Sequence, residues 1–157
     1  MRTACGRLLV LTTIVLFVSC ERKTVFMEER EIKNAVWYQD SALVFNVRVT
    51  DTLYPCKIDF TVDNNDDYSY SNLYLFANVK FPGGKTIRDT VELILADGRG
   101  KWTGKGLLGS HENLFSYRGN IRFPEEGIYT FSIVQAMRCP SQKLDGIKSF
   151  KLSVLKR

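Results

Sequence analysis

The chain has 157 residues, a formal net charge of +5 and 45% hydrophobic residues, which fits one folded domain with a substantial core. The excess positive charge is small and forms no basic stripe, so a nucleic-acid-binding protein is not indicated. One histidine and four cysteines, with no ligand pair at a suitable spacing, argue against a structural zinc site.

The beginning of the chain has the pattern of a bacterial lipoprotein signal peptide. Arg2 and Arg7 accompany an uncharged apolar run over residues 8–18, which is shorter than the roughly 20 residues of a spanning helix. Ser19 and Cys20 stand where this run ends, so cleavage before Cys20 and acylation of its thiol are expected. An ordinary secretory signal with an incidental cysteine is the alternative.

This leader divides the chain into three predicted parts. Residues 1–19 are the cleaved signal peptide, and residues 20–34, charged and poorly patterned, are the lipidated N-terminus and tether. Residues 35–157 are the folded domain. Removal of Arg2 and Arg7 with the leader lowers the net charge from +5 to +3.

The folded domain is predicted to consist of short strands joined by tight turns. Apolar and polar residues alternate with a period of two, as in strands with one buried face, over residues 43–50, 54–62, 73–81, 87–95, 115–123, 129–137 and 150–154. Turn residues separate these segments, and no stretch of the mature chain keeps a helical period. We predict an all-β protein with an antiparallel β-sandwich, either jelly-roll or immunoglobulin-like.

One residue supports the sandwich. Tyr129 enters a predicted strand directly after the turn Glu126-Gly127. In β-sandwiches such a tyrosine can hydrogen-bond back across the corner, so a structural role is expected.

Two cysteines are candidates for a disulfide bond. Cys5 leaves with the leader and Cys20 carries lipid, so Cys56 and Cys139 remain, in a compartment outside the cytoplasm where disulfides form. Both share the alternation of the inward-facing residues beside them. We predict a Cys56–Cys139 disulfide, with two buried free thiols as the alternative.

The sequence offers little for catalysis or metal binding. Ser110 and His111 are adjacent and would point to opposite faces of a strand, and no glycine-flanked nucleophile turn is present. The acidic segment 63–67 resembles a calcium loop only in part, because Tyr68 and Tyr74 replace the required glycine and glutamate. We predict no catalytic residue, no metal and no cofactor.

Aromatic residues are the more informative feature of the polar face. Six of them fall outside the clearest inward sets: Trp37, Tyr38, Tyr68, Tyr70, Tyr74 and Trp102. Exposed rings on a sandwich can pack on a protein partner or stack on sugars, so these residues are the predicted binding surface. The alternative is that they cover the second sheet or a sheet edge.

Several segments in order resemble one family. They are Cys20, Trp37 with Asp40, and the segments 70–76 (YSNLYLF), 89–92 (DTVE), 95–97 (LAD), 100–106 (GKWTGKG), 123–124 (FP), 127–131 (GIYTF), 135–138 (QAMR), Leu144 and 146–147 (GI). Together they resemble the gliding-motility lipoprotein GldH family of Bacteroidetes over nearly the whole mature chain. Cys56 and Cys139 are not part of this pattern.

The resemblance implies a small outer-membrane lipoprotein that is needed for gliding and linked to type IX secretion, with no catalytic residues to carry over. Its expected partners are the membrane, through the lipid, and other envelope proteins. No acidic run follows Cys20, so we expect the protein to face the periplasm. The alternative function is a glycan-binding lipoprotein displayed outside the cell.

Overall fold

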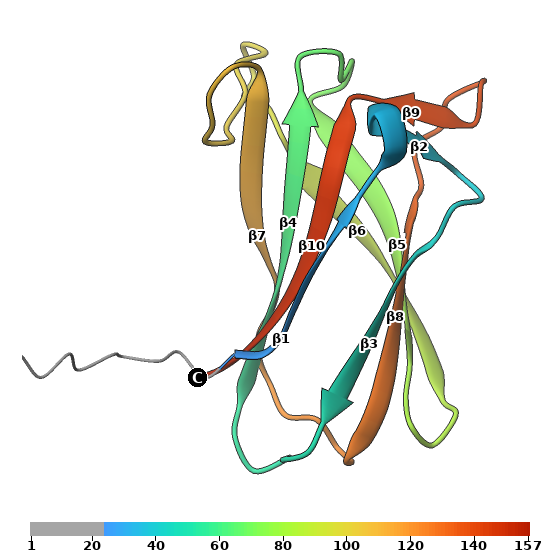
Figure 1. Cartoon of the computed structure of the whole chain (residues 1–157), viewed down its shortest axis with the longest axis vertical. Helices are drawn as coiled ribbons and strands as arrows, with labels where there is room; N and C mark the ends of the chain where they lie inside the picture. Colours follow the sequence, from blue (N-terminus) through green and yellow to red (C-terminus); the bar gives the residue numbers. More distant parts are fainter. Residues whose placement is uncertain (1–23) are drawn as a thin grey trace, which may run out of the picture.

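The structure, a computed structural model, describes residues 24–157, which form two facing β-sheets and a small two-stranded ribbon (Figure 1). The elements are β1 (Thr24–Glu31), the 3-10 turn η1 (Lys33–Ala35), β2 (Val36–Tyr38), β3 (Leu43–Val49), β4 (Cys56–Asn65), β5 (Asn72–Lys80), β6 (Thr86–Ile94), β7 (Ser110–Ile121), β8 (Gly127–Gln135), β9 (Lys143–Asp145) and β10 (Ile147–Lys156). Over this range no helix has the length and hydropathy needed to cross a bilayer.

The strand order is that of a jelly roll. One sheet has the order β1-β10-β4-β7 and the other has the order β3-β8-β5-β6, while β2 and β9 pair with each other. In the two large sheets the first strand pairs with the last, the second with the second-last, and so on inward. This is one long antiparallel hairpin wrapped into two sheets. The predicted all-β sandwich is confirmed, and its order is the jelly-roll one.

The core lies between the two sheets and is rich in aromatic rings. Phe150 of β10 is fully buried at its centre. Its ring centroid lies 6.2 Å from that of Trp37, 5.9 Å from that of Phe45 and 5.2 Å from that of Phe60. Large rings at these separations dominate the stability of such a core.

The sandwich begins earlier than the predicted boundary at residue 35. Strand β1 occupies most of the predicted tether and pairs with β10 along its whole length. Phe26 of β1 packs edge-on against Phe45, with ring centroids 6.5 Å apart. The charges of this segment conceal the strand, because they occur on both of its faces: Glu28 and Arg30 share one face with Phe26, and Arg30 lies 5.7 Å from the centre of the Phe45 ring. The signal peptide 1–19, Cys20 and residues 21–23 lie outside the described residues.

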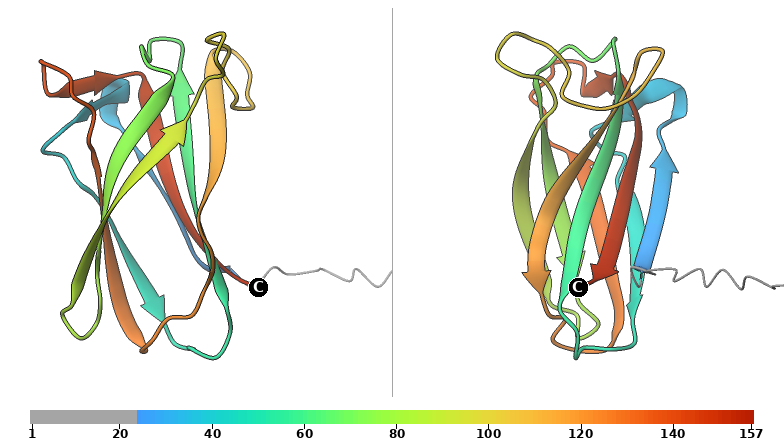
Figure 2. Two further views of the ribbon diagram at one scale, coloured as in Figure 1. Left: turned by 180° about the vertical axis from the view of Figure 1, so that it is seen from behind. Right: turned by 90° about the vertical axis from the view of Figure 1, so that its left-hand side faces the viewer.

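Strand directions define two ends of the sandwich. Thr24 lies at the same end as Cys56 and Lys156, which we call the tether end. Asn65, at the far end of β4, pairs with Ser110 at the opposite end, which we call the loop end. The loop end carries the β4–β5 loop (66–71), the β6–β7 loop (95–109) and the β2–β9 ribbon (Figures 1 and 2). Strands of this length separate the two ends by roughly 30 Å.

Tyr129 makes the predicted corner hydrogen bond. Its hydroxyl donates to the backbone oxygen of Glu125 at 2.9 Å and accepts the backbone N–H of the same residue at 3.3 Å. Its ring packs against Phe81 and Phe123, with centroids 5.2 Å and 4.8 Å away. The β7–β8 connection is therefore tied to the core at the tether end.

Candidate functional site

The six aromatic residues of the predicted binding surface do not form one exposed group. Tyr38, Tyr70 and Tyr74 are exposed, with 52%, 40% and 37% of their surface accessible. Trp102 is partly buried and packs against the core. Tyr70 and Trp102 belong to the two long loops of the loop end, and Tyr74 lies on the outer face of β5.

Trp37 and Tyr68 are buried, so they do not belong to an exposed surface and fit the alternative, in which these rings cover a sheet. The indole N–H of Trp37 donates to the backbone oxygen of Ser41 at 2.8 Å, and its ring faces the core. The Tyr68 hydroxyl donates to the backbone oxygen of Asn72 at 2.7 Å, and burial raises the pKa of this phenol well above its ordinary value. Alternation shows which face a side chain occupies, but not which loop or ribbon covers that face.

The two long loops meet in a cluster of rings, which we call the loop-end cluster. The ring of Tyr68 lies 5.8 Å from that of Tyr70 and 6.2 Å from that of Trp102. Trp102 stacks on His111 at 5.5 Å. Asp66 contacts the indole N–H of Trp102 at 3.2 Å and Nε2 of His111 at 2.8 Å. The hydrogen bond from His111 lowers the pKa of the Asp66 carboxyl.

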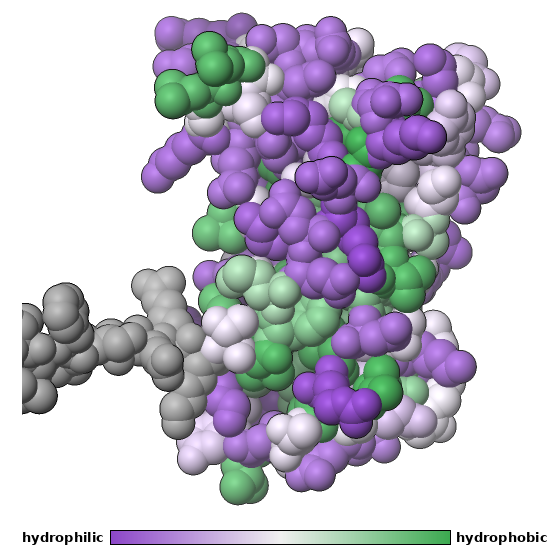
Figure 3. Space-filling view, viewed as in Figure 1, coloured by the Kyte–Doolittle hydropathy of each residue, from purple (hydrophilic) through white to green (hydrophobic). Residues whose placement is uncertain are grey.

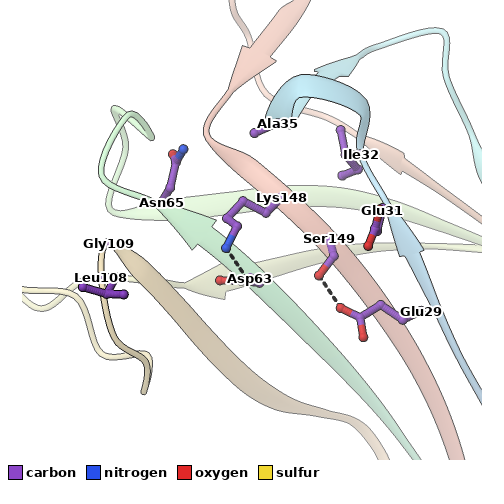
Figure 4. A pocket seen from close by; sticks show the side chains of 10 residues that line it. All are labelled: Glu29, Glu31, Ile32, Ala35, Asp63, Asn65, Leu108, Gly109, Lys148 and Ser149. Carbon is purple, nitrogen blue, oxygen red and sulfur yellow. Dashed lines mark hydrogen bonds and ion pairs between the residues drawn. The ribbon is translucent and has the colours of Figure 1, made fainter.

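A polar pocket of about 580 Å³ lies beside this cluster, over the loop-end halves of β4 and β10 (Figure 4). Lys148 of β10 pairs with Asp63 of β4 at 3.1 Å, and Ser149 donates to Glu29 of β1 at 2.5 Å. The wall of the polar pocket is formed by Glu29, Glu31, Ile32, Ala35, Asp63, Asn65, Leu108, Gly109, Lys148 and Ser149. Three carboxylates and one ammonium group give the wall of the pocket a net negative formal charge.

The contacts of Ser110 assign it a structural role. Its hydroxyl lies 2.7 Å and 2.8 Å from the two oxygens of Asp63, and Nζ of Lys148 lies 2.8 Å from the same hydroxyl. The same ammonium group is paired with Asp63 at 3.1 Å, so the three side chains bind one another. His111 contacts Asp66 instead of Ser110. The geometry joins β4, β7 and β10 and does not activate a nucleophile.

The acidic segment 63–67 is partly strand and partly turn. Strand β4 continues through Asn65, and only then does the chain reverse. Asn65 accepts the backbone N–H of Asp67 at 3.0 Å, which is an Asx turn. Within residues 24–157 no three His, Cys, Asp or Glu side chains converge as metal ligands do.

The tip of the β6–β7 loop is a feature that sequence reasoning missed. Leu107 and Leu108 are exposed, with 84% and 104% of their surface accessible, and the space-filling view shows a hydrophobic patch at this end (Figure 3). Leu108 has a φ of 55°, and Ala35 across the polar pocket has a φ of 54°. A non-glycine residue in this left-handed region costs about 1–3 kcal/mol, and such residues cluster at active sites and ligand-binding sites. Two leucines between Gly106 and Gly109 are the signal that could have revealed the tip.

Cys56 and Cys139 are free thiols in the structure, so the predicted disulfide is not formed. Cys56 begins β4 at the tether end, opposite Lys156. Cys139 lies in the β8–β9 loop, shortly before β10 starts opposite Asn64 at the loop end. Alternation placed Cys56 on the buried face correctly, but Cys139 lies beyond the end of β8 and is only partly buried. Alternation also carries no information about height along the sandwich.

Comparisons with known proteins agree over nearly the whole chain. The sequence model of the GldH lipoprotein family matches residues 24–154. The gliding motility lipoprotein GldH homolog of Christiangramia forsetii is 37% identical over 151 residues, covering 96% of this chain and 91% of that protein. The gliding motility lipoprotein GldH of Flavobacterium johnsoniae is 31% identical over 151 residues, covering 96% and 92%.

Among solved structures, the structure of the infectious bursal disease virus Gx strain has a TM-score of 0.37 at 16% identity, covering 84% of this chain and 33% of that chain. A likeness of this degree carries no argument about fold or function. The family match and the two relatives, each over almost the full chain, show that this protein belongs to the GldH lipoprotein family.

Proposed function

We propose that this protein is a lipid-anchored, non-enzymatic accessory component of the envelope machinery for gliding motility and type IX secretion. It is held at the outer membrane by acylated Cys20 and faces the periplasm. Residues 1–19 are its signal peptide, and residues 20–23 link the lipid to β1. Family membership supports the motility assignment, and the leader supports the anchor.

The observation that carries this proposal is the opposite placement of anchor and loop end. Thr24 follows Cys20 by four positions, and four residues of chain span at most about 14 Å. The lipid therefore holds the tether end close to the bilayer. The loop end, roughly 30 Å away along the strands, is presented to proteins beyond the membrane surface.

The loop end has the character of a protein-binding surface. It combines exposed Tyr70 with the exposed leucines of the β6–β7 tip, and the polar pocket lies between them and β1. Aromatic and aliphatic anchors beside polar groups are typical of the centres of protein interfaces. The backbone geometry at Leu108 holds the tip outward at a cost in free energy, which binding would offset.

The test is photo-crosslinking in cells of a gliding relative that produce the full chain. A photoreactive residue at Tyr70 is compared with one at Ile128, which is exposed to a similar degree, 40% against 44%, on the outer face of β8 near the tether end. We expect Tyr70 to capture envelope proteins of the motility or secretion machinery and Ile128 to capture fewer.

A function test accompanies this experiment. The triple variant Tyr70→Ser, Leu107→Ser, Leu108→Asn keeps the backbone of the tip, because asparagine tolerates a positive φ. We expect it to fail to restore gliding to a deletion strain, whereas Val44→Ser with Ile128→Ser restores it. Full motility of the triple variant, with equal capture at both positions, would refute the proposal.

The alternative of a glycan-binding lipoprotein rests on one observation. A shallow pocket of about 620 Å³ is lined by Tyr74, Phe76, Thr90, Ala136, Met137 and Arg138, so an exposed ring and a guanidinium group face the same groove. Sugars stack on such rings. Protease treatment of intact cells separates the two functions, because a surface-displayed module is digested and a periplasmic one survives.

A further inference from the structure

The two sheets do not close against each other along one edge near the tether end. Strands β6 and β7 are the free edges of their sheets and share no ladder. A cleft of about 310 Å³ opens between them. Figure 2 shows the β5–β6 hairpin and β7 diverging toward this end. The floor of the cleft is made of core side chains, among them Val79, Phe123 and Phe131, each at most 5% exposed.

The wall of this cleft is apolar over most of its depth. Ile87 and Ile121 form its flanks and are only partly buried, although both pack against the core. Water in contact with so much apolar surface is unfavourable, and soluble proteins rarely leave such a cleft open without a ligand for it. The cleft is therefore suited to an aliphatic group.

The rim of the cleft carries three cations and also two carboxylates, Asp89 and Glu125, and Glu125 accepts the backbone N–H of Gly83 at 3.1 Å. Arg118 pairs with Asp89 at 2.6 Å, and the Tyr117 hydroxyl donates to the same carboxylate, so this group links β6 to β7 at the upper rim. Arg122 lines the cleft and is exposed, and Lys85 lies 5.9 Å from the ring of Phe81, another lining residue. Among the ion pairs within residues 24–157, Arg118 has a partner, whereas Arg122 and Lys85 have none.

We propose that this cleft binds the chain of a single-chain anionic amphiphile, a long-chain carboxylate, with the head group held by Arg122 and Lys85. The volume lies at the lower limit of small-molecule sites, which allows one chain but not two. Arg122 and Lys85 form no ion pair among the described residues, so they favour an anionic head group. The acylglycerol proposed on Cys20 is uncharged, so it would form no ion pair with Arg122 or Lys85. The opening at the tether end faces the side from which an amphiphile of the bilayer arrives.

The probe that tests this site is palmitate carrying a photoreactive diazirine within its chain. It is added to washed membranes that contain the full-length protein, so that no acyl transfer accompanies binding. After illumination, modified peptides are mapped by mass spectrometry. We expect adducts on the segments that line the cleft, residues 79–87 and 117–131, and few adducts at Leu114, an exposed side chain on the outer face of β7.

Competition experiments and variants then test the acyl chain and the head group of the ligand separately. Excess palmitate should remove the adducts, and hexadecanol, with the same chain and no charge, should compete about tenfold less well. Arg122→Glu should lower the yield about tenfold, while Arg48→Glu, the same charge change on exposed β3, leaves it unaltered. Ile121→Trp fills the cleft and should abolish labelling in folded protein.

The opposite results overturn the inference. Labelling spread equally over the cleft and Leu114 would mean bulk contact with the bilayer. Equal competition by hexadecanol, or unchanged labelling in Arg122→Glu, would remove the anionic head group from the proposal. Arg122 is exposed, so Arg122→Glu remains informative even where Ile121→Trp does not fold.

Discussion

Gly146 fixes the contact between the loop end and β10. Its φ is +93°, and a Cβ atom at this position would lie 2.3 Å from the backbone nitrogen of Tyr68. Gly146→Ala is therefore expected to lower the free energy of unfolding by about 2–4 kcal/mol, through backbone strain and displacement of the β4–β5 loop. Equilibrium urea unfolding measures this loss. Gly98→Ala is the matched control, because nothing lies within 4 Å of its added methyl group.

Asp66 and His111 couple the loop-end cluster to pH. The hydrogen bond from His111 is the main reason that the pKa of Asp66 is lowered. A lowered folded-state pKa contributes stability above the ordinary pKa of a carboxyl, and this contribution is lost as the pH falls through the folded value. His111→Phe keeps a ring against Trp102 but removes the donor, so it should move the Asp66 pKa back toward its ordinary value, as measured by NMR titration of the carboxyl group. Trp102→Phe, which removes a weaker hydrogen bond, should move it less, and an unchanged pKa in His111→Phe would contradict the assignment.

The two free thiols should differ in reactivity. Burial raises the pKa of Cys56, and only the thiolate reacts with alkylating reagents. Cys139 is only partly buried. In the native protein, iodoacetamide should therefore modify Cys139 before Cys56, as read by peptide mass spectrometry. Denatured, unreduced protein should take up a label at both positions. Absence of labelling at both would mean that Cys56 and Cys139 form a disulfide bond after all.

At the scale of elements, β1 is the strand whose role is easiest to misjudge. Phe26 packs inward on Phe45, and the adjacent Met27 points to solvent with 57% of its surface accessible. If β1 is part of the fold, Phe26→Ala should lower the free energy of unfolding by about 1–3 kcal/mol. Met27→Ala should change it by less than about 0.5 kcal/mol. Equal, negligible effects in urea unfolding would mean that β1 behaves as a tether.

At the scale of the whole molecule, both tryptophans report on orientation. Trp37 and Trp102 are the two tryptophans of the chain, and both lie at the loop end. In vesicles that contain brominated phospholipids, the fluorescence of the full lipidated chain should be quenched very little. A Leu53→Trp variant places a third indole in the exposed β3–β4 loop at the tether end, and its added fluorescence should be quenched. Strong quenching of the native tryptophans would place the loop end on the bilayer.

Sequence reasoning succeeded where information is local. A period of two along each strand was enough to find most of the strands and the inward faces of β3, β5 and β8, because a buried face imposes apolar residues there. The corner bond of Tyr129 was predictable for the same reason, since its turn and strand are adjacent in the chain.

It failed where position depends on distant segments. Trp37 is covered because β2 pairs with β9, about 100 residues later in the chain, and no local pattern records that pairing. The predicted Cys56–Cys139 disulfide was wrong because alternation does not show how far along the sandwich, between the tether end and the loop end, a residue lies. The cleft between β6 and β7 was also hidden, since it arises from two edges that do not pair, and its lining reads as ordinary core.

The wrapped hairpin has a consequence for the order in which the sandwich can form. Strand β10, the final strand of the described residues, lies between β1 and β4, so these two strands cannot be joined into one sheet before β10 has been synthesised. Folds dominated by such distant pairings form slowly, in milliseconds to seconds. The sandwich therefore cannot close before β10 has left the ribosome, and the earlier strands of its sheet wait for this strand to join them.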